Sequence, residues 1–249
     1  SRMRQQMIFR RGTRRIDFEG VLEWHEKHRF LKTAFELNVF ADECRSEIPF
    51  GHIRRTVYRN DPVERAKFEV CQHKWSDLSE GRFGAALLND CKYGISSGPR
   101  GMYLSLCKSG GHPDPSGDEG IHPMNYALIV HDGGFSAGTV VRPAYEFNIP
   151  PVVCRGRSRC SGESRAALDA DNLIVEAVKI AEHSSDPVLR IYECERAAVT
   201  ASLRIDGSAV ECDMRECELR PLSELKGVSR LSFRPFEIKT VKIKRTCRI

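Results

Sequence analysis

Side chains in residues 16–24 alternate between apolar and polar at every second position, and this alternation constrains the fold more than any other feature of the chain. Apart from Gly20, one face carries only apolar residues: Ile16, Phe18, Leu22 and Trp24. A second run, residues 31–39, continues the same period. A period of two is typical of β-strands with one buried and one solvated face. The polar residues 25–29 between the runs suit a turn or bulge, so we expect a long antiparallel pair.

Strand-like runs recur along the rest of the chain in two series. The first comprises residues 47–58, 67–75, 84–88, 102–107 and 126–130, and the second comprises residues 173–178, 188–194, 199–205, 210–215, 228–233 and 236–243. Residues 109–123, with four Gly and three Pro, predict a surface loop, and residues 139–148 predict a short helix or an edge segment. We therefore expect an all-β protein, with one β domain in residues 1–152 and a small C-terminal β-sandwich in residues 168–249, joined by a polar linker in residues 153–167.

The bulk composition is that of an ordinary globular protein and excludes two classes of partner. Charged residues make up 29% of the 249 residues and apolar residues 41%. No apolar run approaches the ~20 residues of a membrane-spanning helix. Six arginines lie within residues 1–15, but acidic side chains follow at once, so we expect neither nucleic acid nor a membrane as a partner. Because the start shows neither an initiator Met nor a signal peptide, we interpret the chain as part of a longer polypeptide.

The ten cysteines indicate a reducing compartment rather than a disulfide framework. A chain of 249 residues can build its own core, and no two cysteines have the C-x-x-C spacing of a metal site. We therefore interpret them as reduced thiols of a cytoplasmic protein. Cys154 and Cys160 flank an arginine-rich loop and form the one surface pair that could oxidise.

No complete catalytic or metal-binding set stands out in the sequence. His25 and His28 have H-x-x-H spacing, but on a polar break between strands they favour a turn over a metal site. The H-x-D pair of His112 and Asp114 lies in the glycine- and proline-rich loop without a second pair nearby. A glycosidase needs two carboxyl groups beside the scissile bond, and Asp90 has no evident partner. We therefore name no catalytic and no metal-ligating residue.

One polar cluster is the candidate binding site. The segment FGAALLNDCKYG, residues 83–94, is a buried-strand pattern that ends in Asn89, Asp90, Lys92 and Tyr93. Amide, carboxylate, amine and aromatic groups at the end of a strand match the hydroxyl groups and C–H patches of a sugar. The same residues also suit a turn in which Asn and Asp bond to the local backbone. Both interpretations stay open, and the four residues are the predicted substrate-binding residues.

Several segments together resemble glycoside hydrolase family 38, the α-mannosidases. They are RRIDFEGVLEWHEKHRFLKTAF, EIPFGHIRRTVYRN, KFEVCQHKWSDLSEGRFGAALLNDCKYG, NYALIVHDG, LIVEAVK and SFRPFEIKTVKI, which follow the order of the family's C-terminal half over nearly the whole chain. The segment at residues 67–94 is the most specific. The chain departs from many relatives at Lys108, where they carry Arg, and at Pro143, where they carry an acidic residue.

The resemblance implies a fold, an activity and partners. Members of this family are retaining, zinc-dependent enzymes whose zinc ligands and nucleophilic Asp lie in an N-terminal catalytic barrel. Residues 1–152 would be a large antiparallel, galactose-mutarotase-like β-supersandwich and residues 168–249 a small β-sandwich. The chain would then be a non-catalytic region, with no cofactor of its own, that packs on the catalytic domain of the same parent chain and helps to bind mannose-containing glycans. The alternative is an autonomous carbohydrate-binding or protein-interaction module.

Overall fold

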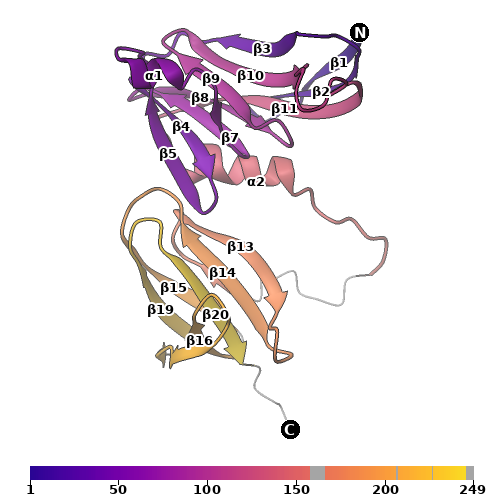
Figure 1. Ribbon diagram of the computed structural model, residues 1–249. Coiled ribbons are helices and arrows are strands. Elements are labelled where there is room, and N and C mark those ends of the chain that lie inside the picture. The colour runs from indigo at the N-terminus through magenta and orange to yellow at the C-terminus, as the bar shows by residue number, and fades with distance from the viewer. Residues whose placement is uncertain (158–165, 206, 226, 245–249) are drawn as a thin grey trace. The chain divides into compact units, whose positions relative to one another are not determined.

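The computed structural model describes residues 1–157, 166–205, 207–225 and 227–244 (Figure 1). Strands dominate, and the chain divides into two compact units, Ser1–Pro151 and Val152–Ile249. Every strand pair is antiparallel. The prediction of an all-β protein built from antiparallel sheets is confirmed. Within the described residues, no helix has the length and apolar character needed to cross a membrane.

The first unit contains two sheets. The larger has seven strands in the order β1 (Arg2–Phe9), β2 (Arg15–Trp24), β11 (Gly120–Asp132), β8 (Phe83–Asn89), β7 (Trp75–Ser79), β4 (Glu43–Ile48) and β5 (Gly51–Thr56). The smaller has four strands in the order β3 (Phe30–Glu36), β10 (Gly101–Lys108), β9 (Gly94–Gly98) and β6 (Val70–Cys71). A short helix, α1 (Pro62–Ala66), precedes β6.

The core of the first unit lies between these two sheets and is made by the alternating residues of both. It includes Phe18, Leu22, Trp24, Leu87, Met102, Leu104 and Tyr126. The rings of Phe18 and Tyr126 stack with their centroids 4.9 Å apart, and Phe35 of β3 meets Phe18 edge-on at 5.5 Å. Aromatic pairs in these geometries stabilise a core beyond the area that they bury.

The expected pairing of the first two alternating runs is wrong. β2 lies between β1 and β11, whereas β3 bonds to β10 in the other sheet. The chain therefore crosses from one sheet to the other at residues 25–29, and the two runs face each other through Phe18 and Phe35. Alternation shows that each run buries one face, but burial against a facing sheet and burial within a hairpin leave the same pattern.

Other local predictions have mixed outcomes. Residues 47–58 form parts of a hairpin, β4 and β5, whose turn is closed by Phe50 at φ 58°. Of residues 67–75, only Val70–Cys71 and the first residue of β7 are strand. β1 was not predicted, because its residues are exposed on both faces and leave no signal of burial.

A helical segment covers the second face of the large sheet. It consists of the π-helical turn η1 (Ala137–Val141) and α2 (Arg142–Asn148), so the helix is the correct one of the two predictions for residues 139–148. Pro143 lies in the first turn of α2, where its missing N–H costs nothing. Because α2 packs on β8, residues 85–88 are buried on both sides of the sheet. This double burial explains their unbroken apolar run.

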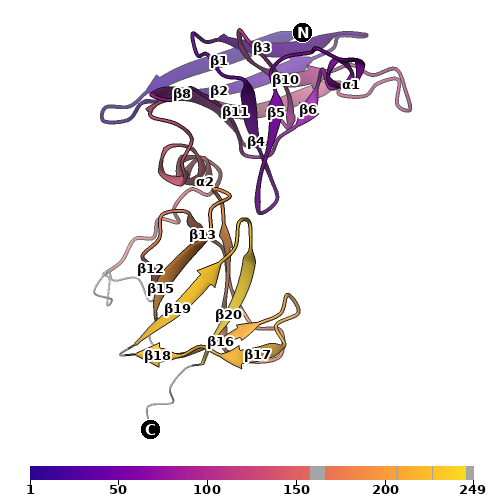
Figure 2. The ribbon, with the colours of Figure 1, turned by 90° about the vertical axis from the view of Figure 1, so that its left-hand side faces the viewer.

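The second unit is a small sandwich (Figure 2). One sheet has the order β12 (Ala166–Leu168), β15 (Val199–Ile205), β19 (Val228–Phe233) and β18 (Glu224–Leu225). The other has the order β13 (Leu173–Ile180), β14 (Pro187–Glu193), β20 (Ile238–Lys244), β16 (Ser208–Cys212) and β17 (Glu218–Pro221). The two sheets share a core that includes Leu173, Ile191, Leu203, Leu231, Phe233 and Val241. The six strands expected in this part of the chain all occur; those at residues 199–205 and 228–233 have the expected ends, and the other four have shifted ends.

Candidate functional site

The turn that follows β8 brings the four predicted binding residues together. Asn89 ends the strand and is fully buried. Its Nδ2 donates to the carbonyl oxygen of His73 at 2.6 Å, and its Oδ1 accepts from the backbone N–H of Lys92 at 2.7 Å. Both polar atoms of this amide are therefore used to hold the turn, in the manner of an Asx turn.

Asp90 is held by Asn125 of the neighbouring strand β11. The Asn125 side chain donates to Asp90 Oδ2 at 2.8 Å, and the Asn125 backbone N–H donates to Oδ1 at 3.3 Å. The backbone N–H of Asp90 donates in return to the Asn125 carbonyl oxygen at 3.2 Å. These three bonds form a clamp between β8 and β11. Asn125 was missed at the sequence level, because only the strand register places it opposite Asp90.

Lys92 and Tyr93 occupy the outer side of the same turn. Tyr93 is 52% exposed, and its ring lies 5.2 Å from that of His73. The Tyr93 carbonyl oxygen accepts from the backbone N–H of Gln72 at 2.8 Å, which fixes the end of the turn. Lys92 is half-buried. The clamp and the Asn89 bonds thus leave an amine and a phenol as the groups presented at this edge.

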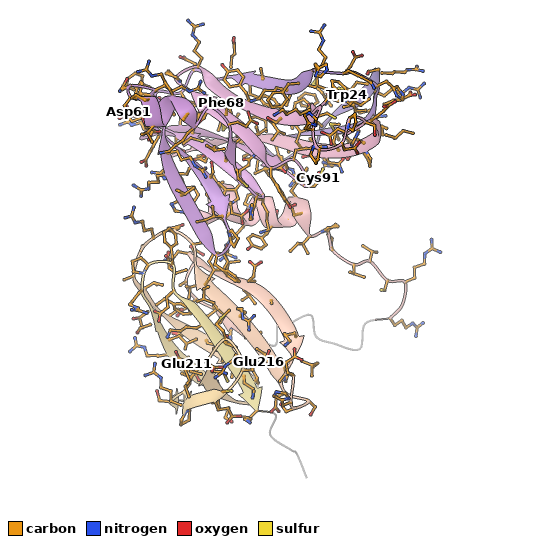
Figure 3. The ribbon with its side chains drawn as sticks, viewed as in Figure 1. Trp24, Asp61, Phe68, Cys91, Glu211 and Glu216 are labelled. Carbon is orange, nitrogen blue, oxygen red and sulfur yellow. The ribbon has the colours of Figure 1, made fainter. Side chains whose placement is uncertain are left out.

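Cys91 stands in the middle of this turn (Figure 3). Burial and the neighbouring Asp90 carboxylate raise the pKa of its thiol to about 11. A thiol with this pKa stays protonated at neutral pH, so it is neither a nucleophile nor a metal ligand there.

Residues of the H-x-x-H motif (His25 and His28) and of the H-x-D motif (Asp114) have local, structural partners or turn conformations. His25 bonds to Glu23 at 3.2 Å and to Glu119 at 3.4 Å, and these carboxylates raise its pKa. His28 has a φ of 53°, a conformation suited to a tight turn. In the loop, Asp114 Oδ1 accepts from the backbone N–H of Ser116 at 2.9 Å and from its hydroxyl at 2.8 Å.

The side chains of these turns do not converge on a common point as zinc ligands would. A zinc site needs three or four convergent Cys, His or carboxylate groups. Within residues 1–157, 166–205, 207–225 and 227–244, no group of three or more such side chains could hold a metal ion. One carboxylate oxygen of Asp114, Oδ1, is engaged in a local turn. The described residues therefore do not fit a zinc site.

The two tryptophans of the chain, Trp24 and Trp75, are core residues. Trp24 is 5% exposed and donates its indole N–H to the Ser109 hydroxyl at 2.7 Å, which in turn donates to the carbonyl oxygen of Glu26. Trp75 is 1% exposed and stacks on Phe135 at 5.0 Å. Neither ring face is presented to a ligand.

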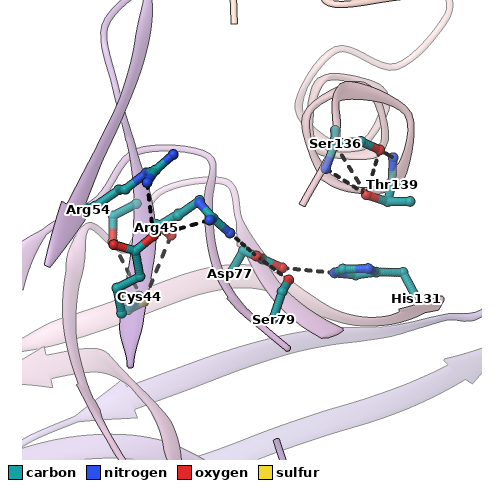
Figure 4. A network of polar contacts seen from close by, with 10 residues as sticks. Cys44, Arg45, Arg54, Asp77, Ser79, His131, Ser136 and Thr139 are labelled. Atoms are coloured by element: carbon teal, nitrogen blue, oxygen red, sulfur yellow. Dashed lines mark hydrogen bonds and ion pairs between the residues drawn. The ribbon is translucent and has the colours of Figure 1, made fainter. Parts of the chain in front are cut away.

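A buried polar network beneath the helical segment was not foreseen from the sequence (Figure 4). His131 Nε2 lies 2.8 Å from Asp77 Oδ1, and the Ser79 hydroxyl donates to Asp77 Oδ2 at 2.6 Å. Arg45 approaches the same carboxylate at 4.0 Å. The imidazole crosses the strand β8 above Gly84, where any side chain would collide with it. Asp77 is fully buried, so this network stabilises the sheet and does not contact a ligand.

A cleft of about 370 Å³ opens near the start of β2 and is lined by charged side chains. The charged side chains Arg14, Arg15 and Asp132 of this lining are paired within the first unit. Arg14 lies 2.5 Å from Asp132, and Arg15 lies 2.6 Å from the buried Asp17, which also pairs with Arg10. Burial lowers the pKa of Arg15. Glu146 also lines this cleft, so the cleft presents a carboxylate beside these pairs.

Two family models match the chain. The model described as the glycosyl hydrolases family 38 C-terminal domain matches residues 1–116. The model described as the glycosyl hydrolases family 38 C-terminal beta sandwich domain matches residues 172–241. The second match falls within the second unit and agrees with the sandwich seen there.

Curated relatives and solved structures agree with these matches. The chain is 36% identical to human alpha-mannosidase 2C1 over 96% of its length, and 32% identical to alpha-mannosidase G of Dictyostelium discoideum over 95%. It spans 24% and 23% of these proteins, about a quarter of their length. The crystal structure of an alpha-mannosidase from Enterococcus faecalis V583 superposes with a TM-score of 0.82 over 97% of this chain and 29% of that one, at 17% identity, which shows the fold alone. The chain belongs to glycosyl hydrolase family 38 and corresponds to a C-terminal region of its members.

Proposed function

We propose that this chain is the non-catalytic C-terminal β region of a zinc-dependent retaining α-mannosidase and packs on the catalytic domain of the same parent chain. The observation that carries the proposal is the identity of 36% to an α-mannosidase over 96% of the chain, combined with a coverage of only 24% of that relative. The larger part of such a protein lies outside these residues. Zinc and the attacking carboxylate are assigned to that part.

The chemistry of the described side chains supports this division. Retaining hydrolysis of a glycoside uses two carboxyl groups ~5–5.5 Å apart, one as nucleophile and one as acid and base. At the predicted site, the single carboxylate, Asp90, accepts two hydrogen bonds from Asn125. A carboxylate committed in this way holds a loop in place and is poorly suited to attack a sugar.

We assign different roles to the four residues of the turn. Asn89 and Asp90 hold the backbone, through the bonds to His73, Lys92 and Asn125. Lys92 and Tyr93 are the groups that meet a mannoside at the wall of the pocket. An ammonium group donates hydrogen bonds to sugar hydroxyls, and a phenol ring covers a C–H patch. Such a wall orients the substrate and takes no part in proton transfer.

Mutation of the parent enzyme tests this assignment. Lys92→Met keeps the length of the side chain and removes its charge. A hydrogen bond from a charged group contributes about 1.5–3 kcal/mol, so we expect kcat/KM on a mannoside to fall about ten- to a hundredfold. Lys67→Met is the matched control. Lys67 is an exposed lysine directly after α1 and pairs with Glu64 of that helix, so its replacement should leave kcat/KM unchanged. An unchanged kcat/KM for a folded Lys92→Met enzyme would remove this turn from the site.

We also propose a cytoplasmic location, on the basis of the thiols. Among the described residues, the side chains of Cys44, Cys71, Cys91, Cys107, Cys154, Cys212 and Cys217 are thiols without a disulfide. Cys44 is packed in the core, and burial raises its pKa to about 11. A buried protonated thiol serves as a small apolar side chain, as is usual in reducing compartments. Cys160, the expected partner of Cys154 in an oxidised pair, lies outside the described residues.

A further inference from the structure

The cleft near the start of β2 lies between the large sheet and the helical segment (Figure 1). Arg15 of β2 and Ile129 of β11 line one side and are directly opposed in the register, so they share a face of the sheet. Residues of η1 and α2, among them Pro143 and Glu146, line the other side. Its volume of about 370 Å³ is at the lower end of the ~300–1,000 Å³ that is usual for small-molecule sites. The cleft therefore has room for a small molecule.

Arg15 is held in place at the wall of this cleft. Its Nε and Nη2 donate to the Asp17 carboxylate at 2.6 Å and 3.3 Å, and its guanidinium lies 5.4 Å from the centre of the Phe147 ring. Among the described residues, Asp17 is the one acceptor of Arg15 and takes two of the five N–H donors of its guanidinium. Three donors remain for a ligand, and their fixed position lowers the entropy cost of binding. Asp17 also pairs with Arg10, so these three side chains together carry one positive charge.

Glu146 presents its carboxylate to the same cleft. Its side chain is exposed and has neither a hydrogen bond nor an ion pair with any residue that the structure describes. Burial and the charge of Arg10 lower the pKa of Arg15, and the charge of Glu146 opposes them, so the carboxylate lies near the guanidinium. Pro143, three residues earlier, lies on the same side of α2. An acceptor, a donor and an apolar ring are thus brought to one place.

The charges of the cleft favour a neutral ligand. Glu146 balances the net positive charge beside Arg15, and Arg14 and Asp132 pair with each other at 2.5 Å on the exposed rim. A small anion would meet two carboxylates and a small cation two guanidinium groups. The described residues also contain no cluster that could hold a metal ion. A neutral molecule with several hydroxyl groups fits this lining, because a hydroxyl group donates to a carboxylate and accepts from a guanidinium.

We propose that this cleft binds a neutral sugar, a mannose unit of a mannose-containing glycan. The identity of the sugar rests on the proposed function. The Glu146 carboxylate accepts hydrogen bonds from two adjacent hydroxyl groups, and Arg15 donates to a third. Ile129 and Pro143 contact the C–H groups of the sugar ring.

This site is separate from the turn at residues 89–93. The strand β11 connects them, with Asn125 at the Asp90 clamp and Ile129 at the cleft. These two residues are four positions apart, which is ~13 Å along a strand. The two sites therefore hold different sugar units.

Carboxyl footprinting of the parent enzyme tests the proposal. A water-soluble carbodiimide with glycine ethyl ester labels exposed carboxyl groups, with and without methyl α-mannoside, and the labels are located by peptide mass spectrometry. We expect saturating methyl α-mannoside to slow the labelling of Glu146 at least about fivefold. Glu182 of the second unit, whose side chain is 67% exposed, is the internal control and should be labelled at an unchanged rate.

A variant that fills the cleft shows where the sugar lies. Gly138 belongs to the lining, and the nearest atom to a Cβ there is Ser136 Oγ at 3.9 Å, so a larger side chain has room to enter the cleft. Gly138→Phe should abolish the protection of Glu146 by methyl α-mannoside. Gly81→Phe is the matched control, since nothing lies within 4 Å of a Cβ at Gly81, and it should keep the protection.

Four results would overturn the proposal. They are equal labelling of Glu146 with and without methyl α-mannoside, no labelling of Glu146 in the enzyme without sugar, protection that persists in Gly138→Phe, and equal protection by sodium sulfate, which would indicate an effect of charge. Mannosidase activity is measured on the same unsubstituted enzyme. An active enzyme with an unprotected Glu146 rejects this inference and leaves the proposed function standing, whereas protection of Glu146 in an inactive enzyme rejects the proposed function and keeps the site.

Discussion

Replacement of Gly84 by alanine tests how the buried network of Figure 4 is built. Gly84 lies opposite His131 in the register of β8 and β11. A Cβ at this position would lie 2.3 Å from His131 Cε1 and 2.5 Å from Ser79 Oγ, distances at which the neighbours must move. The imidazole is 4% exposed and held by Asp77, so any shift away from the new methyl group strains that bond. Gly84→Ala therefore displaces His131 from its carboxylate partner.

The expected destabilisation follows from two costs. Overpacking of a well-packed site costs about 1–3 kcal/mol. Loss of a hydrogen bond to a buried charged group such as the Asp77 carboxylate costs about 1.5–3 kcal/mol. The Ser79 hydroxyl also bonds to Asp77, and it keeps that carboxylate partly satisfied. We therefore expect Gly84→Ala to lower the free energy of unfolding by about 2–4 kcal/mol, which corresponds to a fall in Tm of about 5–15 °C for a unit of this size.

The assay uses the position of the two tryptophans. Trp24 and Trp75 are the only tryptophans of the chain and both lie in the first unit, so their fluorescence during urea unfolding reports that unit alone. Gly81→Ala is the control. Nothing lies within 4 Å of a Cβ there, and we expect a change within about 1 kcal/mol. In a His131→Ala background, Gly84→Ala should cost at least about 1 kcal/mol less. A loss of unfolding free energy below about 0.5 kcal/mol for Gly84→Ala alone, or additive losses in the double variant, would refute a collision between the new methyl group and His131.

Two predictions concern titration. Cys91 and Cys217 are both exposed, but partial burial and the Asp90 carboxylate raise the pKa of the Cys91 thiol to about 11. Iodoacetamide should therefore alkylate Cys91 at least about tenfold more slowly than Cys217 at about pH 8, with a rate that still rises near pH 10, and equal rates by mass spectrometry would contradict this. Burial would raise the pKa of Glu211, but hydrogen bonds from Lys239 and Arg220 outweigh it and lower this pKa. The ionised carboxylate therefore stabilises the second unit above about pH 4.5, and this stabilisation is lost as the pH falls through the lowered pKa. In calorimetric unfolding, the Glu211→Gln variant should therefore lose less stability than the unsubstituted protein between about pH 5 and pH 3. An equal loss would show that the Glu211 carboxyl group does not cause the acid destabilisation.

The strands could be predicted wherever two faces of a run have different surroundings. Residues 199–205 alternate because Ala201, Leu203 and Ile205 are buried in the sandwich core while Thr200 and Arg204 are exposed. The same signal does not specify a partner, so the run at residues 16–24 was recognised as a strand and paired wrongly. β1 has no buried face and left no pattern to recognise.

The candidate site was predictable in part for a related reason. A buried strand followed by Asn89, Asp90, Lys92 and Tyr93 indicated a polar turn at the rim, and the structure places all four in one turn. Which of the four residues hold the turn and which face outward depends on Asn125, the partner of Asp90. Asn125 is 35 residues from Asp90 in the chain and is its neighbour only through the register of β8 and β11. The pairing of Asp77 with His131 spans 54 residues and was hidden for the same reason.

Hydrolysis of an α-mannoside by the parent enzyme and by residues 1–249, compared at equal molar concentration, tests the central claim most directly. The parent enzyme should hydrolyse the substrate, because it contains the nucleophile and the zinc that we assign to the rest of the chain. Residues 1–249 should show no turnover above the uncatalysed rate, with added zinc as well as without it, since the described side chains offer no cluster that could hold a metal ion and we assign the nucleophile to the rest of the parent chain. Turnover by residues 1–249 alone would contradict the account.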